Sequence, residues 1–262
     1  LTVRLLLRQV LMGLRFIIMV SLIKKIYLLF KFFTLPTGSR KRQEILYLLL
    51  HESERESFMQ CYRTYYKSDV PKNHSKIIDL MYDWDKLSKY PKDTLGYQFY
   101  HYHNTNSGVD LINIGVETLL GKGGSKKVDD FRGYLTVMHD LTHVVNGYPL
   151  NRTGEIMTVW FQAIQDNRRS FAWITYGSTL IWIKGFKFHP KYVYKYFTWL
   201  LESRRNAKLS QQFITVDWFS MIDKPVSEVK KLIGLNDAEK YHTGKAKMIR
   251  TINKKYTLDK VL

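Results

Sequence analysis

The sequence predicts a mostly α protein, with a single helical-bundle-like domain that follows a basic amphipathic segment. Apolar residues recur at helical spacing in stretches of roughly 10 to 18 residues along the chain. Strand signals are weak, because β-branched residues are scattered and alternating runs are short. With 262 residues and 45% apolar content, the chain can bury one substantial core. We place the N-terminal segment at 1–36, the helical domain at 40–245 and a basic tail at 246–262.

The N-terminal segment is both basic and apolar. Residues 1–43 hold nine Lys or Arg and no acid, which is half of the formal net charge of +18. Because a cation interrupts every apolar run before the roughly 20 residues of a spanning helix, we expect no transmembrane helix here. Arg4, Arg8 and Arg15 recur at helical spacing, which favours a segment lying on an anionic membrane surface, or a targeting peptide. A core helix whose cations extend outward is the alternative.

Between residues 43 and 89 the apolar spacing again predicts helices, and Pro71 and Pro91 mark breaks. The single cysteine, Cys61, excludes an intrachain disulfide and favours a reducing compartment.

Three linkers are expected, at 36–39, 104–108 and 121–127, because turn-forming residues gather there. The last, GKGGSKK, offers glycine amides and lysines to a phosphate. Because it lacks the Walker spacing and follows no convincing strand, we interpret it as a solvated connector.

The segment 131–165 carries the most chemical information. A helix over 131–145 should end at Asn146 and Gly147, and a second helix should begin near Asn151 or Thr153. At about 100° per residue, the three side chains of the His-Asp-x-x-His motif project within an arc of about 100°. These are His139, Asp140 and His143.

Histidines four apart on a helix can converge on one metal ion. The tight turn after the first helix lets Glu155 return a carboxylate to the same point, and Asp140 could ligate directly or orient a histidine. Each residue alone also fits an ordinary structural role, since Glu155 lies where the helix dipole favours an acid. Together, His139, Asp140, His143 and Glu155 predict a divalent metal site, with zinc expected and iron or manganese as alternatives.

Two hydrolase classes carry related motifs. Zinc peptidases use His-Glu-x-x-His with the glutamate as general base, whereas Asp140 follows the first histidine here. Phosphohydrolases with a His-Asp doublet also need an upstream histidine, which His101 or His103 could supply, and a distant aspartate that no position singles out. A metal-dependent hydrolase is therefore an alternative and not the first expectation.

The motif His-Asp-x-x-His, followed by eleven residues and a glutamate, resembles the signature of the coenzyme Q (ubiquinone) biosynthesis protein 4 family. The stretch PKDTLGYQFY at 91–100 resembles that family's P-x-x-T-x-G-x-x-Y, and GYPLNRTGEI at 147–156 resembles its G-x-P-x-x-x-x-G-E turn. Residues 216–235 resemble the family's C-terminal end, so the resemblance covers roughly 85–238.

The chain departs from the family pattern at several positions beside the motif. Val137 and Met138 replace a usual Arg-Glu pair, and V-W-F-Q-A at 159–163 replaces the usual K-W-F-E-A. The ligand positions match, while some supporting charge is absent.

The resemblance implies a divergent member that acts as a metal-dependent decarboxylase on a polyprenylated hydroxybenzoate, with loss of the C1 carboxylate and hydroxylation at that carbon. It implies peripheral attachment to the bacterial inner membrane on its cytoplasmic face, or to the mitochondrial inner membrane on its matrix face. A non-catalytic lipid-binding scaffold with a structural metal is the main alternative. No catalytic side chain is singled out.

The expected partners are a polyprenylated quinone precursor, an anionic membrane surface, other quinone-biosynthesis enzymes and a second copy of the chain. Residues 171–183 are uncharged and could line a tunnel for an isoprenoid tail, form a buried core helix or dip into the membrane interface. Residues 192–201 add five aromatics, which fit a surface belt. Nucleic acid is not expected, because the basic stripe is interleaved with Leu and Ile and not with stacking aromatics.

Overall fold

The computed structural model describes residues 58–72, 74–105, 126–168, 171–172, 175–179 and 190–244, with scattered positions between Ile23 and Ile45. The chain divides into two compact units, Leu1–Glu52 and Ser53–Leu262. The predicted N-terminal segment falls largely outside the described residues, and the predicted tail lies wholly outside them.

Every named element of the second unit is a helix, and no strand is present in the described residues, which confirms the mostly α prediction. Residues 58–67 are also helical. The named elements are α3 His74–Met81, α4 Trp84–Leu87, α5 Leu95–Thr105, α7 Lys126–Asn146, α8 Arg152–Gln165, α10 Pro190–Leu209, the 3-10 helices η1 Phe213–Thr215 and η2 Trp218–Met221, and α11 Val226–Leu232.

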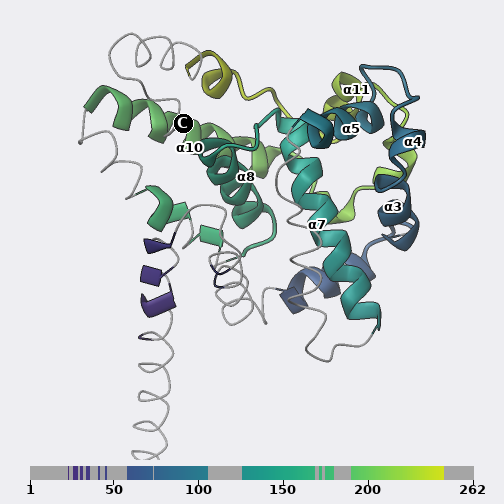
Figure 1. Cartoon of the computed structure of the whole chain (residues 1–262), viewed down its shortest axis with the longest axis horizontal. Coiled ribbons are helices and arrows are strands. Elements are labelled where there is room, and N and C mark those ends of the chain that lie inside the picture. Colours follow the sequence, from purple (N-terminus) through teal and green to yellow (C-terminus); the bar gives the residue numbers. More distant parts are fainter. Residues whose placement is uncertain are drawn as a thin grey trace, which may run out of the picture. The chain divides into compact units, whose positions relative to one another are not determined.

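The long helix α7 is the centre of the main core, and it contacts α3, α5, α8 and α11 (Figure 1). Phe131, Met138, Leu141 and Val145 recur at helical spacing and are all buried in that core. Since α7 also carries the His-Asp-x-x-His motif, the core holds the candidate ligands in place.

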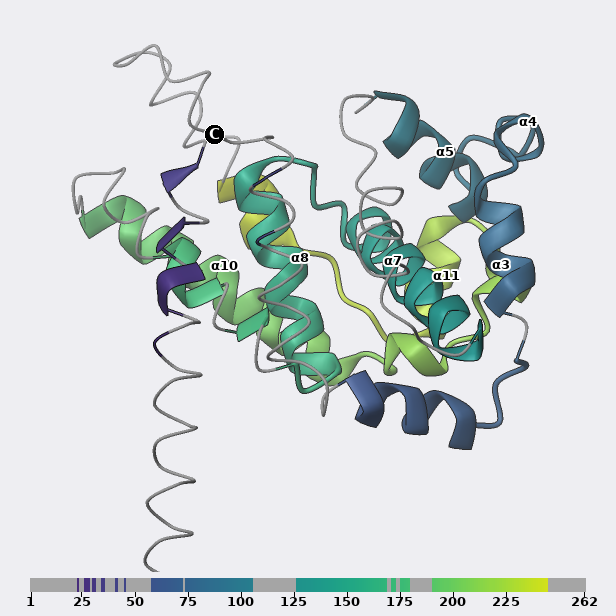
Figure 2. The same cartoon turned by 60° about the horizontal axis from the view of Figure 1, so that its bottom comes forward.

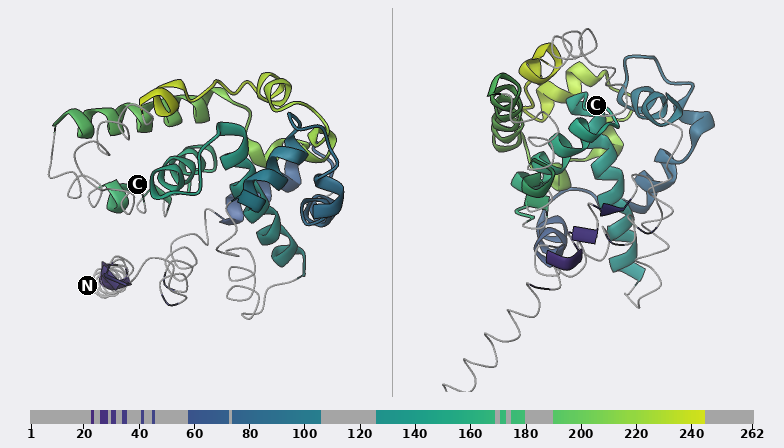
Figure 3. Two further views of the ribbon diagram at one scale, coloured as in Figure 1. Left: turned by 45° about the horizontal axis from the view of Figure 1, so that its top comes forward. Right: turned by 60° about the vertical axis from the view of Figure 1, so that its left-hand side comes forward.

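A second core joins α8 to α10, which lie side by side in Figures 1 and 2. Trp199 and Tyr148 are buried here together with Tyr241. Figure 3 shows the yellow segment after α11 returning beside α10. There Glu202 of α10 accepts hydrogen bonds from the backbone N–H groups of residues 240 and 241, at 2.9 Å each.

The start of α5 is tied to the segment before α11. Thr94 forms an isolated antiparallel bridge with Pro225, and the Gly96 N–H donates to the Ile222 carbonyl at 2.8 Å. A Cβ at Gly96 would lie 3.1 Å from that carbonyl oxygen, so glycine permits the close approach. These backbone contacts hold the start of α5 in place, and the other end of this helix carries Tyr102 and His103.

Two predicted boundaries were wrong. The helix expected from 131 starts earlier, so Lys126 and Lys127, assigned to a loop, are helical. Asn104 and Thr105, also assigned to a loop, belong to α5. The remaining positions of both predicted loops lie outside the described residues. Within the described part of the chain, no helix combines the length and apolarity that crossing a bilayer requires.

Candidate metal centre

The C-terminus of α7 ends in a tight glycine turn. Gly147 has φ +68°, a left-handed conformation that glycine adopts without strain. Its N–H bonds to the Val144 carbonyl at 3.2 Å, and the Tyr148 N–H bonds to the His143 carbonyl at 3.0 Å, which together form a Schellman motif. The helix end predicted at Asn146 and Gly147 is thereby confirmed, and the turn is anchored to His143.

The next helix starts where the sequence predicted. Asn151 is the N-cap of α8, and its side chain accepts a hydrogen bond from the Gly154 N–H at 3.0 Å. A Cβ on Gly154 would overlap the carbonyl oxygen of Pro149, so only glycine fits between the turn and the helix. Glu155 follows directly and therefore occupies a fixed position in the first turn.

Three of the four predicted ligands converge. His143 Nε2 lies 3.3 Å from His139 Nε2. His139 Nε2 lies 3.4 Å from Oε2 of Glu155, and His143 Nε2 lies 3.4 Å from its Oε1. Bonds of about 2.0–2.1 Å around a tetrahedral zinc ion place ligand atoms about 3.3–3.4 Å apart. Each of these pairs of atoms is therefore spaced like two zinc ligands, and the three side chains form the cluster of His, Cys, Asp or Glu that suits a metal ion within the described residues.

The outer nitrogens of both imidazoles are held by the protein. His143 Nδ1 lies 2.9 Å from the Tyr148 carbonyl oxygen, which can only accept, so Nδ1 carries a proton and Nε2 faces the cluster. Thr158 Oγ1 lies 3.2 Å from the same Nδ1. His139 Nδ1 lies 2.9 Å from Gln162 Oε1, and donation to this amide oxygen turns Nε2 toward the cluster in the same way. Such outer contacts orient metal-binding histidines.

The cluster is buried on one side and open on the other. The side chain of His143 is 0% exposed, whereas those of His139 and Glu155 are 23% and 33% exposed. Burial lowers the pKa of His139, but the hydrogen bond and charge of Glu155 outweigh this and raise it to about 9. Burial raises the pKa of Glu155, and the two histidines more than reverse this, so its pKa falls well below the ordinary value.

Asp140 points elsewhere. Its Oδ2 lies 3.5 Å from His103 Nε2 of α5, and neither atom makes a hydrogen bond within the described residues. The aspartate is buried, at 7% exposure. It does not belong to the ligand cluster in this arrangement.

Tyr102 of α5 lies beside the cluster. Its ring centroid lies 5.4 Å from that of His143. Burial, together with the charges of Asp140 and Glu155, raises the pKa of Tyr102 far above its ordinary value, so the phenol is neutral at physiological pH.

Sequence reasoning missed Tyr102, Thr158 and Gln162, and left His103 as a hydrolase alternative. Thr158 and Gln162 follow Glu155 by three and seven residues, so the helical period could have placed them on the ligand face of α8. No sequence signal places α5 beside α7.

Two histidines and a glutamate gather across a helix-turn-helix, in a unit whose named elements are all helices. The fold and the site therefore define a helical protein with a candidate divalent-metal centre. Residues 134–239 match the model of the Coenzyme Q (ubiquinone) biosynthesis protein Coq4 family. This range contains all four predicted ligands. The match and the relatives below fit a divergent member of the Coq4 family.

The similar proteins are related at low identity. The mitochondrial ubiquinone biosynthesis protein COQ4 of Candida glabrata is 26% identical over 199 residues, which cover 72% of this chain and 54% of that protein. The mitochondrial COQ4 homolog of Aedes aegypti is 23% identical and covers 64% and 56%. The chain thus spans about half the length of the curated relatives it matches.

A solved structure shares the fold. The crystal structure of a proposed ubiquinone biosynthesis protein from Nostoc punctiforme aligns with a TM-score of 0.56 and 17% identity, covering 83% of this chain and 97% of that one. At this identity the likeness concerns the fold alone.

Proposed function

We propose that this protein acts in ubiquinone biosynthesis, where it holds a divalent metal ion on His139, His143 and Glu155. The convergence of the two Nε2 atoms and the Glu155 carboxylate, with pairwise nearest distances of 3.3–3.4 Å, carries the metal part of the proposal. The family match and the names of the relatives support the pathway. The proposed substrate is a polyprenylated hydroxybenzoate that loses its C1 carboxylate as carbon dioxide and is hydroxylated at that carbon. This exchange is a two-electron oxidation, for which dioxygen would be the external oxidant.

The side chains around the cluster have distinct tasks in this proposal. Tyr148 and Gln162 hold the imidazoles with their Nε2 atoms facing inward. A bound metal would supply Lewis acidity toward the substrate carboxylate and the neighbouring phenolic oxygen. Tyr102, a neutral donor beside the ligands, is placed to hydrogen-bond to one of these oxygens.

The experiment measures metal content and lipid quinones together. Purified protein should contain one divalent ion per chain, the His139→Ala variant should lose it, and the exposed His101→Ala control should keep it. A deletion strain should accumulate a carboxylated, prenylated intermediate that clears with the wild-type gene and not with His139→Ala. A metal-free wild type would contradict the site, and an unchanged quinone profile would contradict the pathway.

The second candidate function is a non-catalytic lipid-binding scaffold with a structural metal. Such a site needs a fourth protein ligand to close the coordination sphere, and the buried Asp140 would supply it if it turned from His103 toward the metal. Cobalt-substituted protein separates the two functions. A visible spectrum that changes when benzoate is added indicates an open position and catalysis, and an unresponsive tetrahedral spectrum supports the scaffold.

The proposal includes peripheral attachment to a membrane, which for a mitochondrial protein would be the inner membrane. The word mitochondrial in the relatives' names and the basic segment 1–36 support it. In liposome flotation, the full chain should bind anionic vesicles more strongly than a chain starting at Ser39. Equal partitioning would contradict a role for the segment.

A further inference from the structure

Helix α10 presents an exposed face that combines apolar and cationic side chains. Tyr194, Phe197, Leu201 and Leu209 are 72%, 44%, 62% and 56% exposed. At about 100° per residue, they fall within one arc of roughly 120°. Large apolar side chains gathered on one face of a soluble protein usually mark a binding surface.

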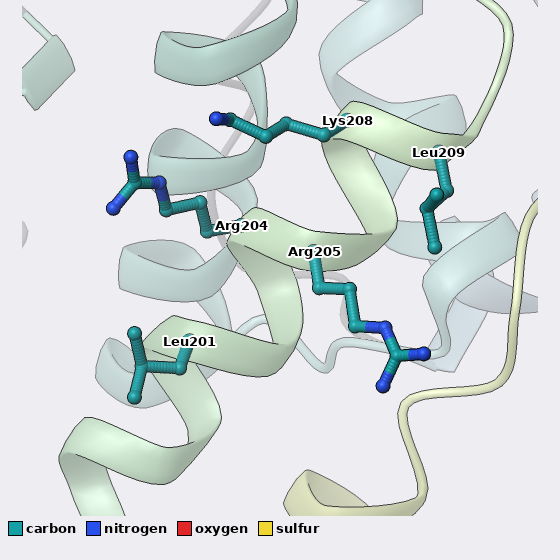
Figure 4. A pocket seen from close by; sticks show the side chains of 5 residues that line it. All are labelled: Leu201, Arg204, Arg205, Lys208 and Leu209. Carbon is teal, nitrogen blue, oxygen red and sulfur yellow. The ribbon is translucent and has the colours of Figure 1, made fainter.

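Three cations lie on the same face. Arg204, Arg205 and Lys208 are exposed and, with Leu201 and Leu209, line a shallow hollow of about 360 Å³ (Figure 4). Figure 4 shows the long cationic side chains extending away from the helix axis.

Nothing within the described residues neutralises this charge. The helix has one acid, Glu202, and its carboxylate accepts from the backbone N–H groups of residues 240 and 241. None of the three cations has an ion-pair or hydrogen-bond partner in the described part of the chain. The face therefore carries a local charge of +3 that is open to an anionic partner.

We propose that this face of α10 docks onto an anionic lipid bilayer, with the apolar side chains at the level of the headgroups and the cations beside the phosphates. Protein–protein interfaces usually have an apolar centre and a charged rim. Here the three cations lie among the apolar side chains, so the partner has to offer anionic groups beside an apolar layer, as the phosphates and acyl chains of an anionic bilayer do. At about 1.5 Å per residue, α10 offers a contact roughly 30 Å long.

This proposed contact involves neither the segment 1–36 nor the metal centre. An experiment can therefore refute the contact and leave the other two proposals intact. A probe on α10 itself is needed, because the N-terminal segment is expected to bind vesicles in the same chain. Cys61 is buried, so a new surface cysteine can be labelled selectively.

The first measurement uses the full chain with Leu201→Cys, labelled with an environment-sensitive fluorophore. Vesicles of phosphatidylcholine with 30% phosphatidylglycerol should shift its emission to the blue, and a lipid-borne quencher should reduce it. Lys89→Cys, exposed just after α4, is the control and should show neither change. Unchanged emission at position 201 would overturn the proposal.

The second measurement tests the cations. The R204Q/R205Q/K208Q variant should partition into these vesicles about 100-fold more weakly, since each cation near an anionic surface contributes about fivefold. The K86Q/K89Q/K92Q control removes the same charge from another surface and should lose less than tenfold. Equal losses in the two variants would refute docking through this face. If the true partner were an acidic protein, the emission of the fluorophore would not change with any vesicle.

Discussion

Gln162 sets the orientation and basicity of His139. It stands where the family pattern usually has glutamate, and its neutral oxygen accepts from Nδ1 at 2.9 Å. Gln162→Leu removes the acceptor and should weaken metal binding about 10- to 100-fold. Gln162→Glu should strengthen it, because a carboxylate makes the imidazole more basic. Competition with a chelator of known affinity measures both, and equal affinities in all three proteins would contradict the role.

Metal binding should depend on pH through His139. With a pKa of about 9, this side chain is protonated at neutral pH in the metal-free protein, so a metal ion must displace one proton. The apparent affinity should rise about tenfold per pH unit between pH 7 and about 9. A flat affinity over this range would show that no proton is released.

The raised pKa of His139 also affects the stability of the metal-free protein. Its stability should fall as the pH rises, whereas the metal affinity should rise. A raised histidine pKa stabilises the fold fully below the ordinary value of 6.5, and this stabilisation disappears as the pH rises through about 9. The free energy of unfolding of the metal-free chain should therefore fall over that interval. The Glu155→Gln variant lacks the interaction that raises the pKa and should show a smaller decline.

His103 and Asp140 form the least expected pair of the site. If His103 orients Asp140, then His103→Ala should leave one metal ion per chain but speed its release to a chelator, while His101→Ala should not. Complete loss of the metal would instead indicate that this pair belongs to the ligand set. An unchanged release rate would indicate that the pair has no connection to the metal.

Much of the site was predictable at this scale, and the reasons are local. His139 and His143 follow from the period of one helix, and Glu155 from the Asn-Gly-Tyr-Pro turn. Gln162 also lies within reach of such reasoning. Asp140 lies on the same arc by the helical period, and its role as a direct ligand rested mainly on the family resemblance. In the structure it faces His103, because α5 packs beside α7. The packing of α5 against α7 has no signature in the sequence.

At the scale of the element, Gly154 controls the entry into α8. Gly154→Ala would force its Cβ into the Pro149 carbonyl, displace Glu155 and lower the free energy of unfolding by about 2–4 kcal/mol. Gly133→Ala in α7 is the matched control. Its Cβ would meet only the end of the Ile78 side chain, and alanine favours a helix by up to about 1 kcal/mol. Urea unfolding measures both changes, and equal stabilities would contradict the steric argument.

Helix boundaries were predictable where the chain has strong punctuation. Asn151 and Gly147 act as cap and stop because of their own side chain and backbone. The start of α7 at Lys126 was missed because the glycines just before it are turn formers, while the two lysines that follow them favour a helix. The five aromatics at 192–201 divide between both faces of α10, so Tyr196 and Trp199 are buried while Tyr194 and Phe197 are exposed.

At the scale of the whole molecule, the metal would join the two cores, since α7 belongs to one and α8 also contributes to the other. At a free zinc concentration about 100 times the dissociation constant, binding adds about 2.7 kcal/mol to stability. The unfolding temperature should therefore rise by about 5–10 °C. His143→Ala, unfolded with and without zinc, should show no such rise.

The most direct measurement of the metal centre is anomalous diffraction from crystals grown with zinc, recorded on both sides of the metal edge. We predict a single strong peak about 2.0–2.1 Å from His139 Nε2, His143 Nε2 and a Glu155 oxygen. A crystal with zinc present and no peak at these three side chains, or with its peak elsewhere, would contradict the metal centre and the chemistry proposed for it.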